Sequence, residues 1–114
     1  MLESVTTKIL VLVNSGPEEK LKVLPGLTLA RVAHDRGVVV RVVFFADGAR
    51  VPLAQDDGFT EVLTALSERG LVPLVCQRIL ETSGAPLELP GFEVTYVGSD
   101  LVRAVNEGFQ AMSF

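Results

Sequence analysis

The residue best suited to covalent chemistry in this sequence is Cys76, the single cysteine among 114 residues. It follows an apolar run over residues 72–75 that predicts a buried strand, and residues 77–81 after it predict a helical turn. A thiol at such a junction is expected to face solvent, beside backbone N–H groups that have no partner within the helix. Because these groups favour the thiolate, which is the nucleophilic form of the side chain, we predict Cys76 as the catalytic residue.

The same cysteine also has a purely structural interpretation. Cysteine is among the residue types most often buried, and it then packs as a small apolar side chain. Arg78 brings a positive charge near the thiol, but residues two apart point in different directions on a helix, and the charge of Glu81 acts in the opposite sense. The residues alone therefore leave both interpretations of Cys76 open, a nucleophile and a core side chain.

Several kinds of chemistry are not expected from so few reactive side chains. One cysteine cannot form an internal disulfide or a Cys-x-x-Cys redox couple, so any partner sulfur belongs to another molecule. The single histidine, His34, lies late in a predicted helix, at the opposite edge of the sheet from the strand ends, so no Cys–His dyad is expected. Asp56 and Asp57 lack further ligands nearby in the sequence. We predict no metal site and no cofactor.

Polar residues and glycines follow the predicted strands, and these positions define the predicted pocket. In a parallel sheet the carboxyl ends of the strands meet at one edge, where ligands bind. The residues predicted to line the pocket are Asn14, Gly16, Asp47, Gly48, Gln77 and Arg78. Residues 14–17 do not match the glycine patterns of phosphate-binding loops, and Pro17 lacks a backbone N–H, so a nucleotide-binding module is the weaker alternative.

The chain that positions these residues alternates between apolar runs and helical patterns. The runs predict strands over residues 8–13, 38–45, 72–75, 92–97 and 109–114. The patterns predict helices over residues 18–37, from 59 to a stop at Gly70, over 77–81 and over 101–107, with residues 46–50 as a loop. Pro25 either opens the first main helix or kinks a longer one.

Such alternation, with connections too long for hairpins, is typical of parallel sheets covered by helices. We predict a single α/β domain over residues 1–114. Its predicted architecture is a three-layer α/β/α sandwich around a mostly parallel five-stranded sheet, of the Rossmann or flavodoxin-like kind. The predicted core face of the first helix consists of Val23, Leu27, Ala30 and Ala33.

Charge and composition limit the classes of partner. The net charge is −4 and the lysines and arginines form no basic run, so nucleic-acid binding is not expected. No apolar run approaches the roughly 18 residues that suggest a membrane helix. Residues 1–8 also lack the pattern of a signal peptide, so we predict a cytoplasmic protein without membrane contact. The hydrophobic fraction of 48% indicates a sheet covered on both faces or surface buried between subunits; we expect both, and hence a homo-oligomer.

The order of these elements, with the cysteine in its place, resembles the DsrE/DsrF-like (also TusD-like) family. The similar segments are residues 8–18 (KILVLVNSGPE), 42–49 (VVFFADGA) and 75–80 (VCQRIL) with Ser83 and Gly84 after them, then residues 91–94 and 105–109. Members of this family are small α/β proteins that assemble as trimers or hexamers. In the best understood members, a cysteine at the end of the third strand carries persulfide sulfur in a relay for sulfur oxidation or tRNA thiolation.

The resemblance implies that Cys76 corresponds to this sulfur-carrying cysteine, in a single DsrE-like domain over residues 1–114. It predicts a sulfur-carrier or sulfurtransferase-like protein, with persulfide donor and acceptor proteins as partners and a homotrimer or homohexamer as the assembly. The alternative is a non-catalytic oligomer of the same fold that binds a small ligand or a partner protein, with Cys76 only lining a pocket.

Overall fold

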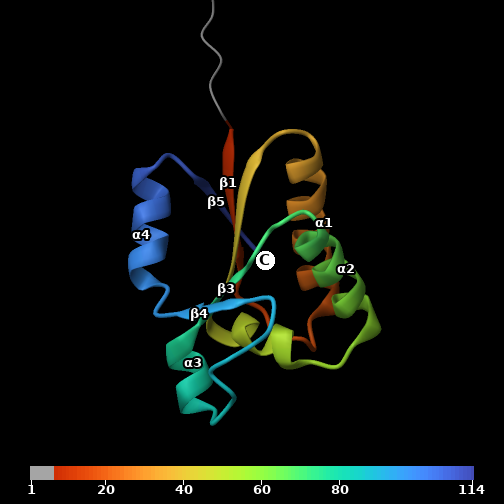
Figure 1. The fold of residues 1–114 in the computed structure, drawn as a ribbon, viewed down its shortest axis with the longest axis vertical. Helices are drawn as coiled ribbons and strands as arrows, with labels where there is room; N and C mark the ends of the chain where they lie inside the picture. The colour runs from red at the N-terminus through yellow and green to blue at the C-terminus, as the bar shows by residue number, and fades with distance from the viewer. Residues whose placement is uncertain (1–6) are drawn as a thin grey trace, which may run out of the picture.

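The computed structural model describes residues 7–114, which form one sheet between layers of helices. The strands are β1 (Lys8–Val13), β2 (Val39–Phe44), β3 (Leu74–Cys76), β4 (Glu93–Thr95) and β5 (Gln110–Ser113). The helices are α1 (Lys20–Asp35), α2 (Asp57–Glu68), α3 (Gln77–Thr82) and α4 (Gly98–Asn106), together with the 3₁₀ helix η1 (Ala46–Leu53). Seen along the sheet, α1 and α2 lie on one side and α4 on the other (Figure 1).

All strand pairings in the sheet are parallel, and the strand order is β4-β3-β2-β1-β5. The chain therefore steps from β1 to β4 toward one edge, and α4 then carries it back so that β5 lies beside β1. Right-handed crossovers that run in opposite directions place their helices on opposite faces, which explains the two helical layers. The predicted three-layer α/β/α fold is confirmed, and the sheet predicted as mostly parallel is parallel throughout the described residues.

The main core lies between the sheet and α1. Val23, Leu27 and Ala30 have no exposed surface and Ala33 is 7% exposed, so the predicted core face of this helix is confirmed. The strands contribute fully buried side chains that include Val11, Val13, Phe44 and Val75. Continuous valine-rich runs are typical of parallel strands covered on both faces. Burial of each such side chain contributes about 1.5–3 kcal/mol of transfer free energy.

Pro25 was expected either to open the first main helix or to lie inside a longer one, and the structure decides between the two. α1 begins at Lys20, so Pro25 lies inside the helix instead of opening it. The next residue, Gly26, is buried against Phe114, and a Cβ atom on Gly26 would lie 2.5 Å from Cγ of that ring. The Pro-Gly pair therefore marks the place where α1 comes closest to the segment that follows β5.

Some element boundaries differ from the predictions. Residues 46–50 are not a loop but belong to η1. β3 begins at Leu74, because Pro73 has no N–H for a strand ladder, and Val72 before it is 59% exposed. α4 begins earlier than predicted, at Gly98.

No helix within residues 7–114 combines the length and the apolar character that crossing a membrane requires. α1 has 16 residues, fewer than the roughly 18 that suggest a membrane helix. The cytoplasmic location stays a prediction.

Candidate functional site

Cys76 is the last residue of β3 and immediately precedes α3. The strand-to-helix junction predicted from the sequence is therefore confirmed. The register pairs Cys76 with Thr95, the last residue of β4, so the cysteine lies at the carboxyl edge of the sheet. Its side chain makes no capping hydrogen bond to the backbone N–H groups that open α3.

The thiol of Cys76 does not face solvent in the single chain. The residue is only 5% exposed, so this prediction is wrong. The strand register gives the physical reason. Leu74, which pairs with Val43 in the sheet, lines a groove together with Ala104 of α4, so its side chain lies on the α4 face. Side chains two residues apart on a strand share a face, so Cys76 lies on the same face as Leu74. Cys76 therefore points to the α4 face of the sheet, where it joins the buried core.

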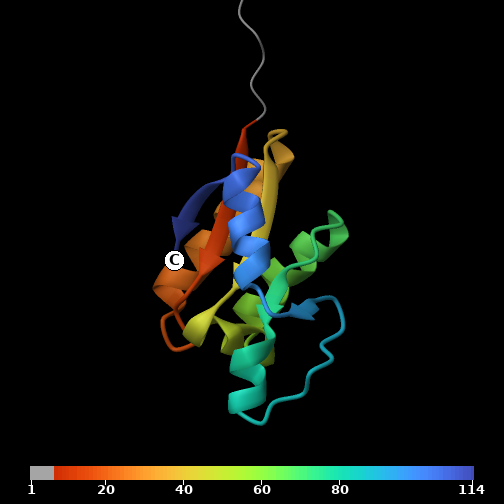
Figure 2. The same cartoon turned by 90° about the vertical axis from the view of Figure 1, so that its left-hand side faces the viewer.

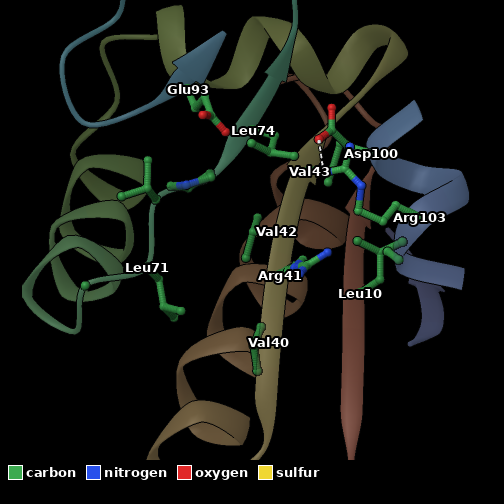
Figure 3. A pocket seen from close by; sticks show the side chains of 14 residues that line it. Leu10, Val40, Arg41, Val42, Val43, Leu71, Leu74, Glu93, Asp100 and Arg103 are labelled. Carbon is green, nitrogen blue, oxygen red and sulfur yellow. Dashed lines mark ion pairs between the residues drawn. The ribbon is translucent and has the colours of Figure 1, made fainter. Parts of the chain in front are cut away.

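The α4 face also carries a groove of about 350 Å³ between α4 and strands β1 to β4 (Figure 3). Its lining includes Leu10, Arg41, Val43, Leu74, Glu93 and Arg103. Figure 3 shows Arg41 pointing from β2 toward α4, while an ion pair of 3.9 Å joins Asp100 and Arg103 on the helix. The groove reaches Leu74, but Cys76 is not part of its lining, so this groove does not lead to the thiol.

η1 brings Asp47 and Gly48 to the ends of β1 and β2. Gly48 packs so closely against the carbonyl oxygen of Val13 that a Cβ atom at this position would overlap it. Its N–H donates to the carbonyl oxygen of Phe45 at 2.9 Å, which tightens the turn after β2. η1 also packs against α3, so the segments that follow β2 and β3 lie side by side.

An ion pair connects η1 to the segment that follows β1. Arg50 donates to both carboxylate oxygens of Glu18, at 2.8 and 3.2 Å, and its guanidinium lies 3.9 Å from the carboxylate of Asp47. This contact with Arg50 holds the pKa of Glu18 below its usual range. Gly16 lies directly against the pair, since a Cβ atom there would be 2.6 Å from a Glu18 oxygen. Gly16 and Asp47 are thus brought together around this ion pair.

Asn14 lies beside Phe114, in a different part of the edge. The N–H groups of Asn14 and Ser15 donate to the carbonyl oxygen of Phe114 at 2.7 and 3.1 Å. Oδ1 of Asn14 is buried and has no hydrogen-bond partner among the described residues. Asn14 lines a groove of about 440 Å³ with Phe114 and Pro25, and the lining of that groove does not include Cys76.

Gln77 and Arg78, which follow Cys76 directly, belong to a polar cluster on the outside of α3. The Tyr96 hydroxyl donates to Oε2 of Glu81 at 2.6 Å, and the Gln77 amide donates to the same oxygen at 3.3 Å. The Arg78 guanidinium lies 5.5 Å from the centre of the Tyr96 ring, within cation–π range. The hydrogen bond to Glu81 raises the pKa of Tyr96 above its usual value.

Tyr96 is the member of this cluster that reasoning from the sequence missed. It is the only tyrosine of the chain and it stands at the end of the fourth predicted strand. In a parallel sheet that position belongs to the same edge as Cys76, and this was the signal that could have identified it.

The carboxyl edge of the sheet therefore carries one buried cysteine and several separate groups of polar residues. Within residues 7–114, no group of three His, Cys, Asp or Glu side chains is arranged to hold a metal ion. Cys76 is a free cysteine, and a reagent can reach its thiol only when the surrounding chain opens.

Comparison with solved structures shows the same fold in other proteins. The ychN protein from E. coli superposes with a TM-score of 0.81 over 96% of this chain and 100% of that chain, at 13% sequence identity. A conserved protein of unknown function from Bacteroides thetaiotaomicron, BT1422, gives a TM-score of 0.73 over 94% of each chain, at 16% identity. At these identities the likeness shows the fold alone.

The sequence itself shows the family. No curated protein matches the chain. The model of the DsrE/DsrF-like family matches residues 7–114, which cover all the strands and helices described above. The resemblance drawn from the separate segments is thereby confirmed over nearly the whole sequence, and the chain belongs to the DsrE/DsrF-like family.

Proposed function

We propose that this protein carries persulfide sulfur on Cys76 and passes it to another protein. The observation that carries the proposal is the position of the only cysteine, at the end of the third strand of a DsrE/DsrF-like chain. The family resemblance implies a sulfur-carrying cysteine at that position. The general association of the DsrE/DsrF-like family with sulfur relays supports this chemistry over other reactions of a lone thiol.

Two displacement steps describe the transfer. First, the Cys76 thiolate attacks the outer sulfur of a donor persulfide, R–S–SH, so that a bond forms between Sγ and the outer sulfur. The S–S bond of the donor breaks, and the donor leaves as a thiolate that takes up the proton given up by Cys76. Second, an acceptor thiolate attacks the outer sulfur of Cys76–S–SH, and Cys76 leaves as the thiolate. Neither step needs an oxidant or a reductant.

The residues around Cys76 have supporting roles in this proposal. The backbone N–H groups that open α3 lack intrahelical partners, and they can stabilise the anionic sulfur once the Cys76 side chain turns toward them, since it makes no hydrogen bond to them in the closed chain. Gln77 and Arg78 border the thiol along the chain, while the more distant Asn14, Gly16, Asp47 and Gly48 shape the edge of the sheet. The partners are persulfide donor and acceptor proteins, and the working form is a homotrimer or a homohexamer.

Loading with sulfur tests the proposal. The protein is incubated with a small-molecule persulfide donor, and its mass is measured without reduction. We expect one added sulfur atom on the wild type, removed by a reducing agent, and none on Cys76→Ser, whose circular dichroism shows that it folds. Equal labelling of both proteins, or labelling of neither, contradicts a sulfur carrier.

The alternative function is a binding module in which Cys76 is a structural residue. The 5% exposure of Cys76 favours this alternative, because a buried thiol packs as a small apolar side chain. The rate of iodoacetamide labelling against pH separates the two. A labelling midpoint near the ordinary cysteine pKa of about 8.5 supports the binding module, and a midpoint below it supports the carrier.

A further inference from the structure

A hydrogen bond on the surface ties α3 to the segment that connects β4 with α4. The Tyr96 hydroxyl donates to Oε2 of Glu81 at 2.6 Å, and the Gln77 amide adds a second contact to that oxygen at 3.3 Å. The guanidinium of Arg78 lies over the Tyr96 ring. Two side chains of α3, Glu81 and Arg78, thus contact one side chain beyond β4, and Gln77 supports Glu81 from within the helix.

This contact closes a ring of chain to which Cys76 itself belongs. Going one way from Cys76, the chain enters α3 and reaches Glu81 within the same helix. Going the other way, the sheet pairs Cys76 with Thr95, which immediately precedes Tyr96. The Glu81–Tyr96 hydrogen bond joins the two arms. It is therefore placed to decide whether the segments on either side of the buried thiol can move apart.

The structure of the α3 segment is suited to such a movement. α3 has six residues, of which only Leu80 is buried. The connection from α3 to β4 loops out from the body of the fold (Figure 2), and its residues 86–88 and 90 are exposed. Gly84 and Gly91, near the two ends of this connection, have φ values of 67° and 87°, a conformation that glycine adopts without strain. A short helix with one buried side chain belongs to the least stable parts of a fold.

We infer that Tyr96 and Glu81 are positioning residues that hold α3 and the β4–α4 connection closed over Cys76, and that breaking their hydrogen bond exposes the thiol. That this opening admits a persulfide partner rests on the proposed function. The opening itself does not, because any small alkylating reagent reports it. The inference accounts for a nucleophile that is 5% exposed in the closed chain.

Alkylation of Cys76 by iodoacetamide measures the opening. If the thiol reacts only from the open form, its rate is proportional to the population of that form. Loss of one hydrogen bond, in Tyr96→Phe, should raise the rate about two- to tenfold. Glu81→Ala should raise it similarly, and the double variant should gain less than the product of the two effects, since both remove the same contact. A Tyr96→Phe rate equal to that of the wild type overturns the inference.

A matched control is available within the same helix. The Thr82 hydroxyl donates to the carbonyl oxygen of Ile79 at 3.0 Å, a contact that does not reach β4. Thr82→Ala therefore removes a surface hydrogen bond of α3 without releasing Tyr96, and its labelling rate should stay at the wild-type value. Acceleration by Thr82→Ala as large as that by Tyr96→Phe contradicts a specific role for Tyr96.

Low concentrations of urea separate local opening from general loss of stability. Local opening exposes little surface, so its labelling rate should hardly change with urea, whereas a rate limited by global unfolding rises steeply. A steep rise for Tyr96→Phe even in dilute urea overturns the inference. If Tyr96→Phe accelerates alkylation but the wild type never takes up sulfur, the closure stands and the sulfur carrier fails. If Tyr96→Phe leaves the alkylation rate unchanged while the wild type takes up sulfur, the closure fails and the carrier stands.

Discussion

At Gly48, the absence of a side chain allows η1 to lie directly on the end of β1. The carbonyl oxygen of Val13 occupies the space that a Cβ atom would need. Backbone groups move less readily than flexible side chains, so a larger residue cannot be accommodated by a change of rotamer. The position of Asp47 and Arg50 at the sheet edge depends on this approach, because both belong to the same turn of η1.

Gly48→Ala is therefore expected to lower the free energy of unfolding by about 1–3 kcal/mol, as overpacking does at well-packed positions. Chemical denaturation followed by circular dichroism measures this change. Gly98→Ala is the matched control, since nothing lies within 4 Å of a Cβ atom built there. An unchanged stability of Gly48→Ala would show that η1 can shift away from β1.

Only part of the surroundings of Cys76 could be predicted from the sequence. The sequence placed the thiol correctly between a strand and a helix, because a valine-rich run and a helical pattern meet there. It could not give the direction of the side chain, which depends on the pairing of Val43 with Leu74 and on the helix that covers that face. A run of three strand residues shows neither the strand register nor which helix covers each face of the strand.

At the scale of elements, two ion pairs tie α1 to α2. The Asp56 carboxylate lies 2.9 Å from Nζ of Lys20 and also accepts from the N–H groups of Gly58 and Phe59. At the other end of the helix pair, Arg69 donates to both carboxylate oxygens of Asp35, at 2.6 and 3.0 Å. The two ion pairs therefore connect the two helices that cover one face of the sheet near both of their ends.

Asp56→Asn tests the ion pair with Lys20 independently of the helix cap. The substitution removes the negative charge, but asparagine still accepts hydrogen bonds at the start of a helix. Contact with Lys20 holds the pKa of Asp56 below its ordinary value of 3.8. A lowered folded-state pKa gives stability that is present above pH 3.8 and is lost as the pH falls through the folded-state pKa. We expect a lower Tm for Asp56→Asn at pH 7 and a difference that closes below pH 3.8.

Thermal melts at a series of pH values in dilute buffer check this expectation. Added salt should also reduce the difference at pH 7, since the pair is partly exposed. A difference in Tm that stays constant down to the lowest pH would assign the effect to the cap and not to the ion pair.

The helical elements were predictable to different degrees. α1 and α2 follow from apolar periodicity and end where Gly37 and Gly70 take positive φ values. η1 was not predictable, because its order comes from packing: Ala49 and Val51 are fully buried by contacts distant in sequence. The polar cluster around Tyr96 was missed for a related reason, since Glu81 and Tyr96 are brought together only by the parallel pairing of β3 with β4.

At the scale of the whole molecule, apolar surface remains uncovered in the single chain. Leu21 on α1 is 93% exposed, and Val102 and Val105 on α4 are 63% and 59% exposed. Leu21 also borders a shallow groove of about 550 Å³, lined mostly by apolar side chains of α1. Apolar surface of this kind on both helical layers supports the proposed homo-oligomer.

Light scattering coupled to size exclusion should therefore give a mass that is three or six times that of the 12.2 kDa chain. The multiple comes from the family resemblance, and the association itself from the uncovered apolar surface. Repeating the measurement over a tenfold dilution shows whether the assembly is stable. A monomer at micromolar concentration contradicts the proposed assembly.

The place of β5 in the sheet also has a consequence for how the chain is made. β1 is synthesised before the other four described strands, yet it gains its second neighbour only when residues 110–113 pair with it. Until then every nascent chain exposes an open edge on one of its most apolar strands, a template for wrong pairing. Contacts this distant in sequence form slowly. The edge of β1 that β5 covers in the finished fold therefore stays open until nearly all of the described chain has been synthesised.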